Sequence, residues 1–316
     1  MKIVTQLDNF WADRTVVTVG TFDGIHKGHA KILDFLRSQA IAYDASSVVF
    51  TFSQHPRQVL NPNDASLKLL TTFEEKSNLL EKKGIDILIS HPFTQEFAAL
   101  SSEDFIRYLK GKTRLSALIV GFNHQFGKNR EGSGASLKDY AKKYNFELHL
   151  IDALTQDEIS ISSTKIRNAL MSGDIFTANK YLGYCYSLTG TVVEGNKIGK
   201  TIGFPTANIE VADKMKLLPA FGVYAVQIVI GTTSYNGMLS YGVRPTIENI
   251  EHTPALEVHI FDFNDTIYNT EITIRFKARL RDEQKFNSIE DLIRQMKIDR
   301  QRALMFLPRT TNLVCQ

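Results

Sequence analysis

The chain has 316 residues, of which 43% are hydrophobic and 22% charged, and its formal net charge is +3. This composition is typical of a globular protein long enough for two domains. The charge is too small and too dispersed to indicate nucleic-acid binding, and no apolar run approaches the roughly 18 residues of a membrane span. We therefore expect small-molecule ligands and no nucleic-acid or membrane partner, while self-association stays open.

The two cysteines, Cys185 and Cys315, lie far apart and form no CxxC pair. This spacing excludes a cysteine zinc site and provides no disulfide framework, which favours a reducing compartment. The segment Trp11-Ala12-Asp13-Arg14 interrupts the N-terminal stretch before it could resemble a signal peptide. We expect a cytoplasmic protein.

Apolar strands alternate with helices in the first half of the chain. The expected strands are Val16–Val19, Val48–Phe52, Ile85–Ile89, Ala117–Val120 and Glu147–Ile151. The first expected helix opens near Gly28. Three more span 72–83, 102–110 (closed by Gly111) and 136–144, and a fifth begins near Ile161. This alternation predicts a parallel sheet covered by helices on both faces.

Three unusual segments each follow the end of a predicted strand. They are the loop Gly20–His29, the turn His55-Pro56-Arg57 and the loop Gly121–Gly127. The carboxyl ends of parallel strands share one edge of the sheet, and ligands bind at that edge in open α/β folds. We therefore expect one ligand site there.

The loop Gly20–His29 predicts a phosphate site. Its glycines let backbone N–H groups approach a ligand closely, and the helix after it presents a positive end. The residues expected at the phosphates are Gly20, Phe22, Asp23, Gly24, His26, Gly28 and His29. A single histidine is more often a packing residue, but two histidines in this context favour function. The loop is neither a Walker A sequence nor a dinucleotide-binding motif.

A second phosphate site is indicated where a helix begins with Ser162, Ser163 and Thr164. Hydroxyl groups alone are explained by a helix cap. Lys165 and Arg167 add two cations to the same helix end, which favours anion binding.

The second half changes to short strands joined by turns. These are Ser187–Val193, Gly222–Ile230, Ala255–Phe263 and Glu271–Leu280, followed by an amphipathic helix from Ser288. The pattern predicts a small antiparallel barrel or sandwich with a terminal helix. We expect one domain at 1–184, a second at 185–307 and a tail at 308–316.

Two motifs in the chain resemble those of known families. His26-x-Gly28-His29 resembles the HxGH signature of nucleotidylyltransferases. Gly195–Thr201 is one residue too short for a P-loop and leads into Gly203-Phe204-Pro205, which cannot form a helix. The segment Gly199–Asn208, with Gly-Phe-Pro-Thr-Ala-Asn at its core, resembles the riboflavin kinase signature. Together the motifs resemble the prokaryotic bifunctional riboflavin kinase/FAD synthetase family, from about Thr15 to Leu304.

That resemblance implies a fold and two reactions. The fold is an α/β nucleotidylyltransferase-type Rossmann-like domain with a parallel sheet, followed by a small antiparallel β-barrel with a C-terminal helix. The reactions are ATP-dependent phosphorylation of riboflavin to FMN, and adenylylation of FMN by ATP to FAD with release of pyrophosphate. Mg²⁺ is implied in both.

The resemblance also implies residue roles. His26 and His29 would stabilise charge on the ATP phosphates, and Glu257 would be the base of the kinase reaction. Further ATP or phosphate contacts would come from Ser162, Ser163, Thr164, Arg167, Gly199, Lys200, Gly203 and Pro205. Flavin contacts would come from Arg57, Asn123 and Phe126, and Mg²⁺ contacts from Thr206 and Asn208. Without the family, Glu257 is better explained as a surface charge on an alternating strand.

The sequence departs from the family pattern at three places. Lys200 replaces the usual Arg, Asn269 follows Tyr268 where Gly is common, and Asn123-His124 replaces a frequent Asp-Phe pair. The first two fall in the kinase half. A rival hypothesis is therefore an FAD synthetase whose kinase-like domain is inactive or only binds flavin. Two more hypotheses stay open: a non-catalytic flavin-binding regulator, and an enzyme that transfers a nucleotidyl group to a different phosphate.

Overall fold

The computed structural model describes residues 1–7, 10–64, 66–121, 125–128, 131–152, 154–156, 159–195, 199, 203–243 and 254–308. Its contacts divide the chain into two compact units, Met1–Ser163 and Thr164–Gln316. This division lies earlier in the chain than the expected boundary at 184/185, which stays a prediction about function.

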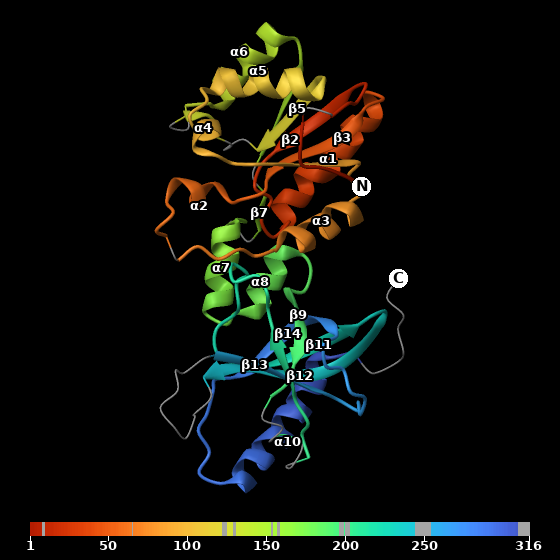
Figure 1. The fold of residues 1–316 in the computed structure, drawn as a ribbon, viewed down its shortest axis with the longest axis vertical. Helices are drawn as coiled ribbons and strands as arrows, with labels where there is room; N and C mark the ends of the chain where they lie inside the picture. Colours follow the sequence, from red (N-terminus) through yellow and green to blue (C-terminus); the bar gives the residue numbers. More distant parts are fainter. Residues whose placement is uncertain are drawn as a thin grey trace. The chain divides into compact units, whose positions relative to one another are not determined.

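A six-stranded parallel sheet forms the centre of the first unit (Figure 1). The strand order is β1-β4-β3-β2-β5-β6. The strands are β1 (Lys2–Val4), β2 (Thr15–Val19), β3 (Ser46–Phe52), β4 (Ile87–His91), β5 (Leu115–Gly121) and β6 (Glu147–Ile151). The predicted parallel sheet is confirmed.

Helices cover both faces of this sheet because its central strands are apolar on both sides. They are α1 (Lys27–Ala42), α3 (Phe73–Lys82), α5 (Ser102–Thr113) and α6 (Gly134–Tyr144). The unit also contains the short helices α2 (Pro56–Leu60) and α4 (Gln95–Ala98), and a separate hairpin of β7 (Thr155–Gln156) and β8 (Ile159–Ser160). Leu33 of α1 and Leu80 of α3 share a core cluster with Val16. Val17, the next residue along β2, belongs instead to the cluster with Ile106 of α5 and Leu137 of α6.

Local capping decides the helix ends. The predicted capping box of α3 is confirmed, since Glu75 N–H donates to Thr72 Oγ1 at 3.2 Å and Thr72 N–H to Glu75 Oε2 at 3.0 Å. The predicted end of α5 at Gly111 was wrong. The helix continues to Thr113 because Arg114 supplies the left-handed residue, with φ 49°. The expected turn at His55–Arg57 is the start of α2, with His55 as N-cap.

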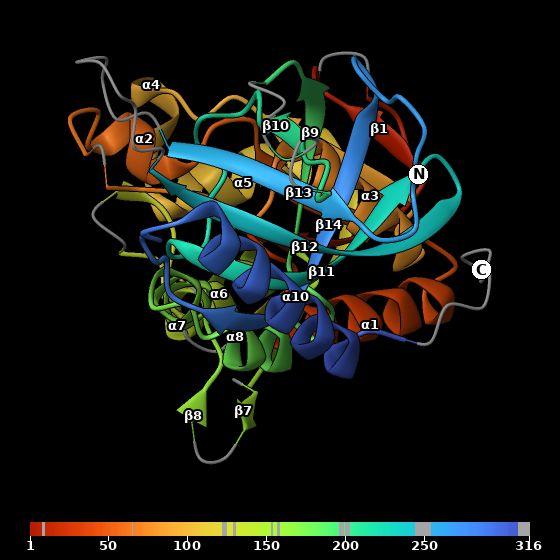
Figure 2. The same cartoon turned by 90° about the horizontal axis from the view of Figure 1, so that it is seen from below.

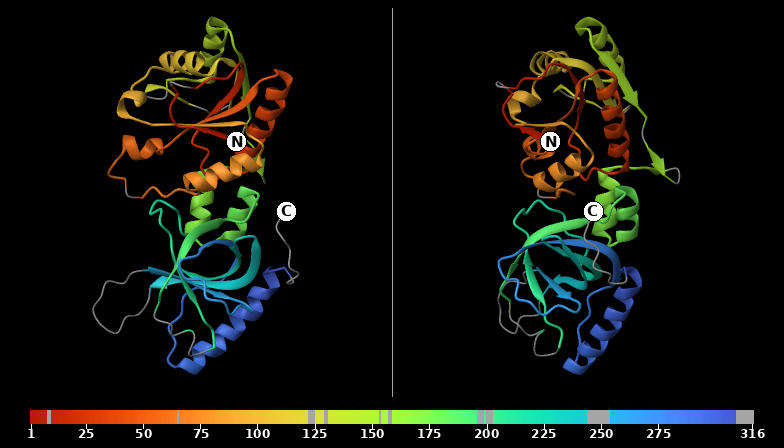
Figure 3. Two further views of the ribbon diagram at one scale, coloured as in Figure 1. Left: turned by 45° about the vertical axis from the view of Figure 1, so that its right-hand side comes forward. Right: turned by 90° about the vertical axis from the view of Figure 1, so that its right-hand side faces the viewer.

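The second unit is a closed antiparallel barrel with strand order β10-β13-β12-β11-β14-β9. The strands are β9 (Ser187–Val193), β10 (Ala207–Glu210), β11 (Gly222–Ile230), β12 (Thr233–Val243), β13 (Pro254–Ile260) and β14 (Glu271–Arg281). α7 (Ser163–Met171) begins at the division and α8 (Ile175–Leu182) contacts β14. α10 (Ile289–Phe306) packs against β11, β12 and β14 (Figures 2 and 3). The predicted barrel and terminal helix are confirmed.

An ion pair ties α10 to the barrel wall. Asp299 of α10 is 1% exposed, and its carboxylate accepts from Arg281 Nε at 3.2 and 2.9 Å and pairs with Arg281 Nη2 at 2.8 Å. Gln295 Nε2 donates to the same carboxylate at 2.8 Å. The buried charge is therefore both neutralised and hydrogen-bonded, which is the condition for keeping it out of water.

Candidate active sites

The loop between β2 and α1 is strained. Phe22 and Ile25 have φ of 48° and 38°, in the left-handed region that residues other than glycine rarely adopt. Such a conformation costs about 1–3 kcal/mol and persists only where the surrounding contacts hold it. Gly24, with φ 84°, adopts the region freely. The loop therefore depends on anchors elsewhere in the unit.

Asp23 is the main anchor. Its buried carboxylate accepts hydrogen bonds from the backbone N–H groups of Leu70 at 3.0 Å and Thr71 at 3.1 Å. Gly24 N–H donates to Thr71 Oγ1 at 3.1 Å, and the Ser163 hydroxyl donates to the Asp23 carbonyl at 2.9 Å. The carboxylate of Asp23 thus holds the loop to the segment before α3.

His26 and His29 form a stacked pair at the N-terminus of α1. Their ring centroids are 3.7 Å apart with an interplanar angle of 13°. His26 is the N-cap, and its Nδ1 accepts from His29 N–H at 3.2 Å, so the proton of the neutral ring is on Nε2. Burial lowers the pKa of His26 from 6.5 to about 4. Burial, His26 and Lys76 lower the pKa of His29, so both rings are uncharged at neutral pH.

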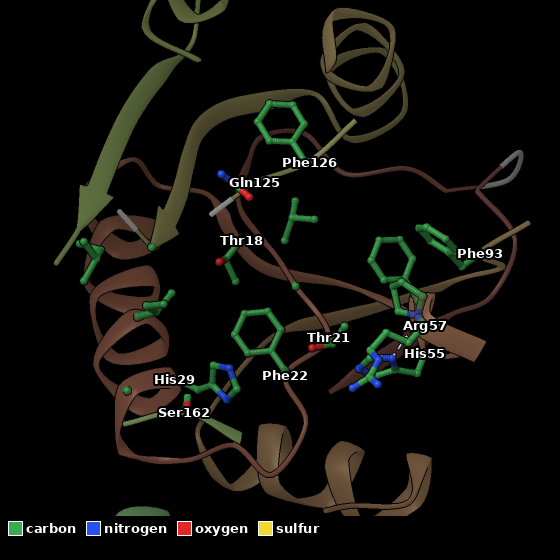
Figure 4. Close-up of a pocket in the computed structure, with 18 of the residues that line it drawn as sticks. Thr18, Thr21, Phe22, His29, His55, Arg57, Phe93, Gln125, Phe126 and Ser162 are labelled. Carbon is green, nitrogen blue, oxygen red and sulfur yellow. Dashed lines mark hydrogen bonds between the residues drawn. The ribbon is translucent and has the colours of Figure 1, made fainter. Parts of the chain in front are cut away.

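A cavity of about 680 Å³ opens beside this pair. The predicted site residues that line it are Gly20, Phe22, His26, Gly28, His29, Arg57, Phe126 and Ser162. Figure 4 shows His29 and Ser162 at one side and His55, Arg57 and Phe93 at the opposite side. The structure thus brings together residues that are far apart in the sequence. Asp23 and Gly24 do not line this cavity.

An aromatic wall lines another part of the cavity. We define it as Phe52, Phe93, Phe97, Phe105 and Phe126. Its rings meet mostly edge to face, as at Phe52–Phe93 with centroids 4.9 Å apart at 78°. Sequence reasoning identified only Phe126, because the members come from separate segments with no shared spacing. Such a wall suits a large planar ring.

Lys76 is a second residue that sequence reasoning missed. Its Nζ donates to the Thr21 carbonyl at 3.1 Å and to Thr51 Oγ1 at 3.4 Å. Burial lowers the pKa of Lys76, and the charge of Asp23 opposes this shift. No sequence signal marks it, because a lysine on a polar helix usually faces water.

The other residues predicted for the adenylyltransferase site are not among the described residues that line the cavity. Thr164 and Arg167 follow the division on α7, so their contact with ATP stays a prediction. Asn123 and His124 lie outside the described residues, as does Lys200 of the kinase half.

The kinase-like residues meet in the second unit. Thr206 Oγ1 donates to Glu257 Oε2 at 3.2 Å, and Asn208 of β10 lies opposite Glu257 of β13 in the strand register. Gly199 accepts from Phe204 N–H at 2.9 Å, and a Cβ at Gly199 would lie 2.3 Å from the Phe204 carbonyl oxygen. The position therefore needs glycine.

Two further details concern the second unit. His259, which sequence reasoning missed, donates from Nδ1 to the Pro205 carbonyl at 2.8 Å. Asn269 has φ 61°, a conformation that glycine adopts freely and asparagine tolerates. The departure from the family's usual Gly thus preserves the backbone turn.

The described residues contain no group of three or more His, Cys, Asp or Glu that could hold a metal ion. The side-chain oxygens of Thr206 and Asn208 are nevertheless the ligand type that Mg²⁺ prefers. This donor set fits a magnesium ion that is also bound by substrate phosphates.

Two family models match the chain. The model for FAD synthetase matches residues 10–165, and the model for riboflavin kinase matches residues 182–307. These ranges contain the cavity and the Thr206–Glu257 cluster, respectively.

Curated relatives match both halves together. Proteins named bifunctional riboflavin kinase/FMN adenylyltransferase include one from Listeria monocytogenes, 36% identical over 95% of each chain. Another, from Bacillus subtilis, is 35% identical over 93% of this chain and 92% of the relative. A third, from Escherichia coli K12, is 33% identical over 98% of this chain and 99% of the relative.

A solved structure has the same fold. It is described as a macrolide-efflux protein from Streptococcus pneumoniae, with a TM-score of 0.87, 31% identity and coverage of 96% of this chain and 98% of that chain. In the described part of the present chain, no helix is long and apolar enough to cross a membrane.

Proposed function

The chain belongs to the bifunctional riboflavin kinase/FMN adenylyltransferase family, and on that premise we propose which of its residues carry each reaction. The enzyme phosphorylates riboflavin with ATP to give FMN, and adenylylates FMN with ATP to give FAD and pyrophosphate. We assign FAD formation to residues 1–184 and FMN formation to residues 185–307. Since both reactions consume ATP, we place the enzyme in the cytoplasm.

In the adenylyl transfer, the attacking phosphate of FMN is already anionic, so no general base is needed. The work of the site is positioning and charge stabilisation. The imidazole N–H groups of His26 and His29, with the N-terminus of α1, would stabilise charge at the α- and β-phosphates of ATP. Ser162, Ser163, Thr164 and Arg167 would hold the β- and γ-phosphates.

The flavin would lie on the aromatic wall. Its planar ring system needs apolar faces, whereas its phosphate must reach the histidine side of the cavity. Arg57 lies at the side opposite His29 (Figure 4) and is paired with Asp64 at 2.6 Å. This separation of apolar and phosphate-binding sides supports the assignment of the two substrates.

In the kinase reaction the nucleophile is a neutral ribityl hydroxyl, which benefits from a base. Glu257 would accept that proton. Thr206 and Asn208 would hold Mg²⁺, which when bound neutralises phosphate charge on ATP. Gly199, Lys200, Gly203 and Pro205 would form the nucleotide-binding segment, and the 3.2 Å contact between Thr206 and Glu257 supports a common site.

The observation that carries the adenylyltransferase assignment is the stacked pair of uncharged histidines at the N-terminus of α1, beside a cavity with an aromatic wall. The test is incubation of the purified full chain with riboflavin and ATP, with and without Mg²⁺, and separation of FMN and FAD by chromatography. We expect both products only with Mg²⁺. If the protein converts added FMN to FAD but does not convert riboflavin to FMN, the result supports the rival hypothesis of an FAD synthetase whose second unit only binds flavin.

A further inference from the structure

Lys76 occupies an unfavourable place for a cation. It lies in the first turn of α3, after Glu74 and Glu75, where the helix dipole disfavours positive charge. It is also partly removed from water, and this burial lowers its pKa. Its ammonium group donates hydrogen bonds to Thr21 and Thr51, both outside its own helix. Because a lysine at this position costs stability, we expect it to have a role in holding the loop between β2 and α1.

The Thr21 carbonyl is the point of contact. It accepts from Lys76 Nζ at 3.1 Å and from Thr51 Oγ1 at 3.2 Å. Thr21 lines the cavity and directly precedes Phe22, one of the two strained residues. Lys76 therefore restrains the loop just before the turn that leads to His26. The Asp23 anchor acts on the same loop with the opposite charge.

We propose that Lys76 is a positioning residue for adenylyl transfer: its ammonium group fixes the Thr21 carbonyl before the turn that leads to the histidine pair, and it places a positive charge beside His29. This inference rests on the proposed function of the cavity. The charged and titratable groups near His29 are His26 on α1, Asp23 in the loop and Lys76 on α3, with His55, Arg57 and Asp152 elsewhere in the cavity wall.

The two effects have separate consequences. Loss of the hydrogen bond to Thr21 frees the loop and should lower kcat for FAD formation. Loss of the charge removes repulsion of a protonated His29 and should raise its pKa, because Lys76 is one of the groups that lower it. A residue that served only to pack α3 would not move the His29 titration.

The test compares Lys76→Met, Lys76→Gln and Lys76→Arg with Lys83→Met in the full chain. Lys83 is the C-cap of the same helix, and its Nζ lies 3.6 Å from Asp34, away from the loop. Histidine titrations are followed by NMR on ¹⁵N-histidine-labelled protein without ligand. We expect a raised His29 pKa in the two uncharged variants and no change with Lys76→Arg or Lys83→Met.

Kinetics give the second readout. We expect Lys76→Met to lower kcat for FAD formation about 10–100-fold, with Lys76→Arg recovering part of the loss and FMN formation within two-fold of the parent in every variant. Because FMN formation is assigned to the second unit, fluorescence of Trp11 in the first unit reports whether a Lys76 variant is folded. Lys76→Gln, which keeps a donor, replaces Lys76→Met if that variant fails to fold.

An unchanged His29 titration in the uncharged variants overturns the proposal, as does full FAD formation in Lys76→Met. If the parent protein forms no FAD, the proposed function fails instead, while the titration of the ligand-free protein still tests Lys76.

Discussion

Replacing His26 by asparagine should make the first unit less sensitive to acid. Asparagine is a favoured N-cap residue, so its side-chain oxygen can accept from His29 N–H as Nδ1 does now. The substitution therefore keeps the cap and removes a buried base. That base has a pKa of about 4 in the folded protein, against 6.5 ordinarily, because burial disfavours the imidazolium.

The sign follows from proton binding. Between pH 6.5 and 4 the unfolded chain holds a proton on His26 that the folded chain does not, so acid favours unfolding. The stability loss is absent well above pH 6.5 and complete below pH 4. The gap between the two pKa values amounts to about 3 kcal/mol at the acid limit, of which about 2 kcal/mol is present at pH 5.

Urea unfolding at pH 7.5 and pH 5 measures this difference. Trp11, the single tryptophan of the chain, lies in the first unit and reports its unfolding. We expect the stability loss between the two pH values to be about 2 kcal/mol smaller in His26→Asn than in the parent. Loss of the ring stacking lowers the free energy of unfolding of the variant at both pH values, so it cancels in the difference between them. An equal loss in the two proteins would refute the assignment of a buried neutral His26.

Four further substitutions have distinct expected results. His29→Ala should lower FAD formation about 10²–10³-fold without affecting FMN formation, because it removes a donor at developing charge; equal loss of both activities would contradict two separate sites. Glu257→Gln should do the reverse, and near-normal FMN formation would remove the base role. Asp23→Ala should lower the urea-measured free energy of unfolding of the first unit by about 2–6 kcal/mol, since two buried N–H groups lose their acceptor; unchanged stability with a raised KM for ATP would favour a phosphate contact instead. Asp299→Ala should destabilise the barrel by about 3–5 kcal/mol by leaving Arg281 unpaired, seen as a lower temperature of inactivation for FMN formation, and an unchanged temperature would speak against a stabilising pair.

Local patterns were sufficient to predict the architecture of both units. Apolar runs such as Val48–Phe52, alternating with helical segments, indicate buried parallel strands, and the Thr72–Glu75 capping box marks the start of a helix. The phosphate loop was also recognisable, because its chemistry is contained in ten consecutive residues. Such features depend on neighbours in the sequence.

Features that depend on distant neighbours were not predictable from the residues alone, and the role of Glu257 was predicted only through the family resemblance. Glu257 is 51 residues from Thr206, and only the pairing of β10 with β13 turns a strand charge into part of a site. The aromatic wall and Lys76 likewise have no local signal. Asp23 belongs to the loop by sequence, but the direction of its side chain follows from left-handed backbone at Phe22 and Ile25, which no rule for ordinary residues anticipates.

The closed barrel and the open sheet also differ in how they can associate with other chains. Closure pairs each barrel strand on both sides, so the described barrel strands offer no continuous row of unpaired backbone groups. In the part of the chain that the structure describes, β6 has a partner strand on one side only. Exposed Glu147 places a charge at that edge, which discourages pairing with a second sheet. Because β6 has an unpaired side and the described barrel strands do not, any aggregation through strand pairing during overexpression or partial unfolding should begin in the first unit.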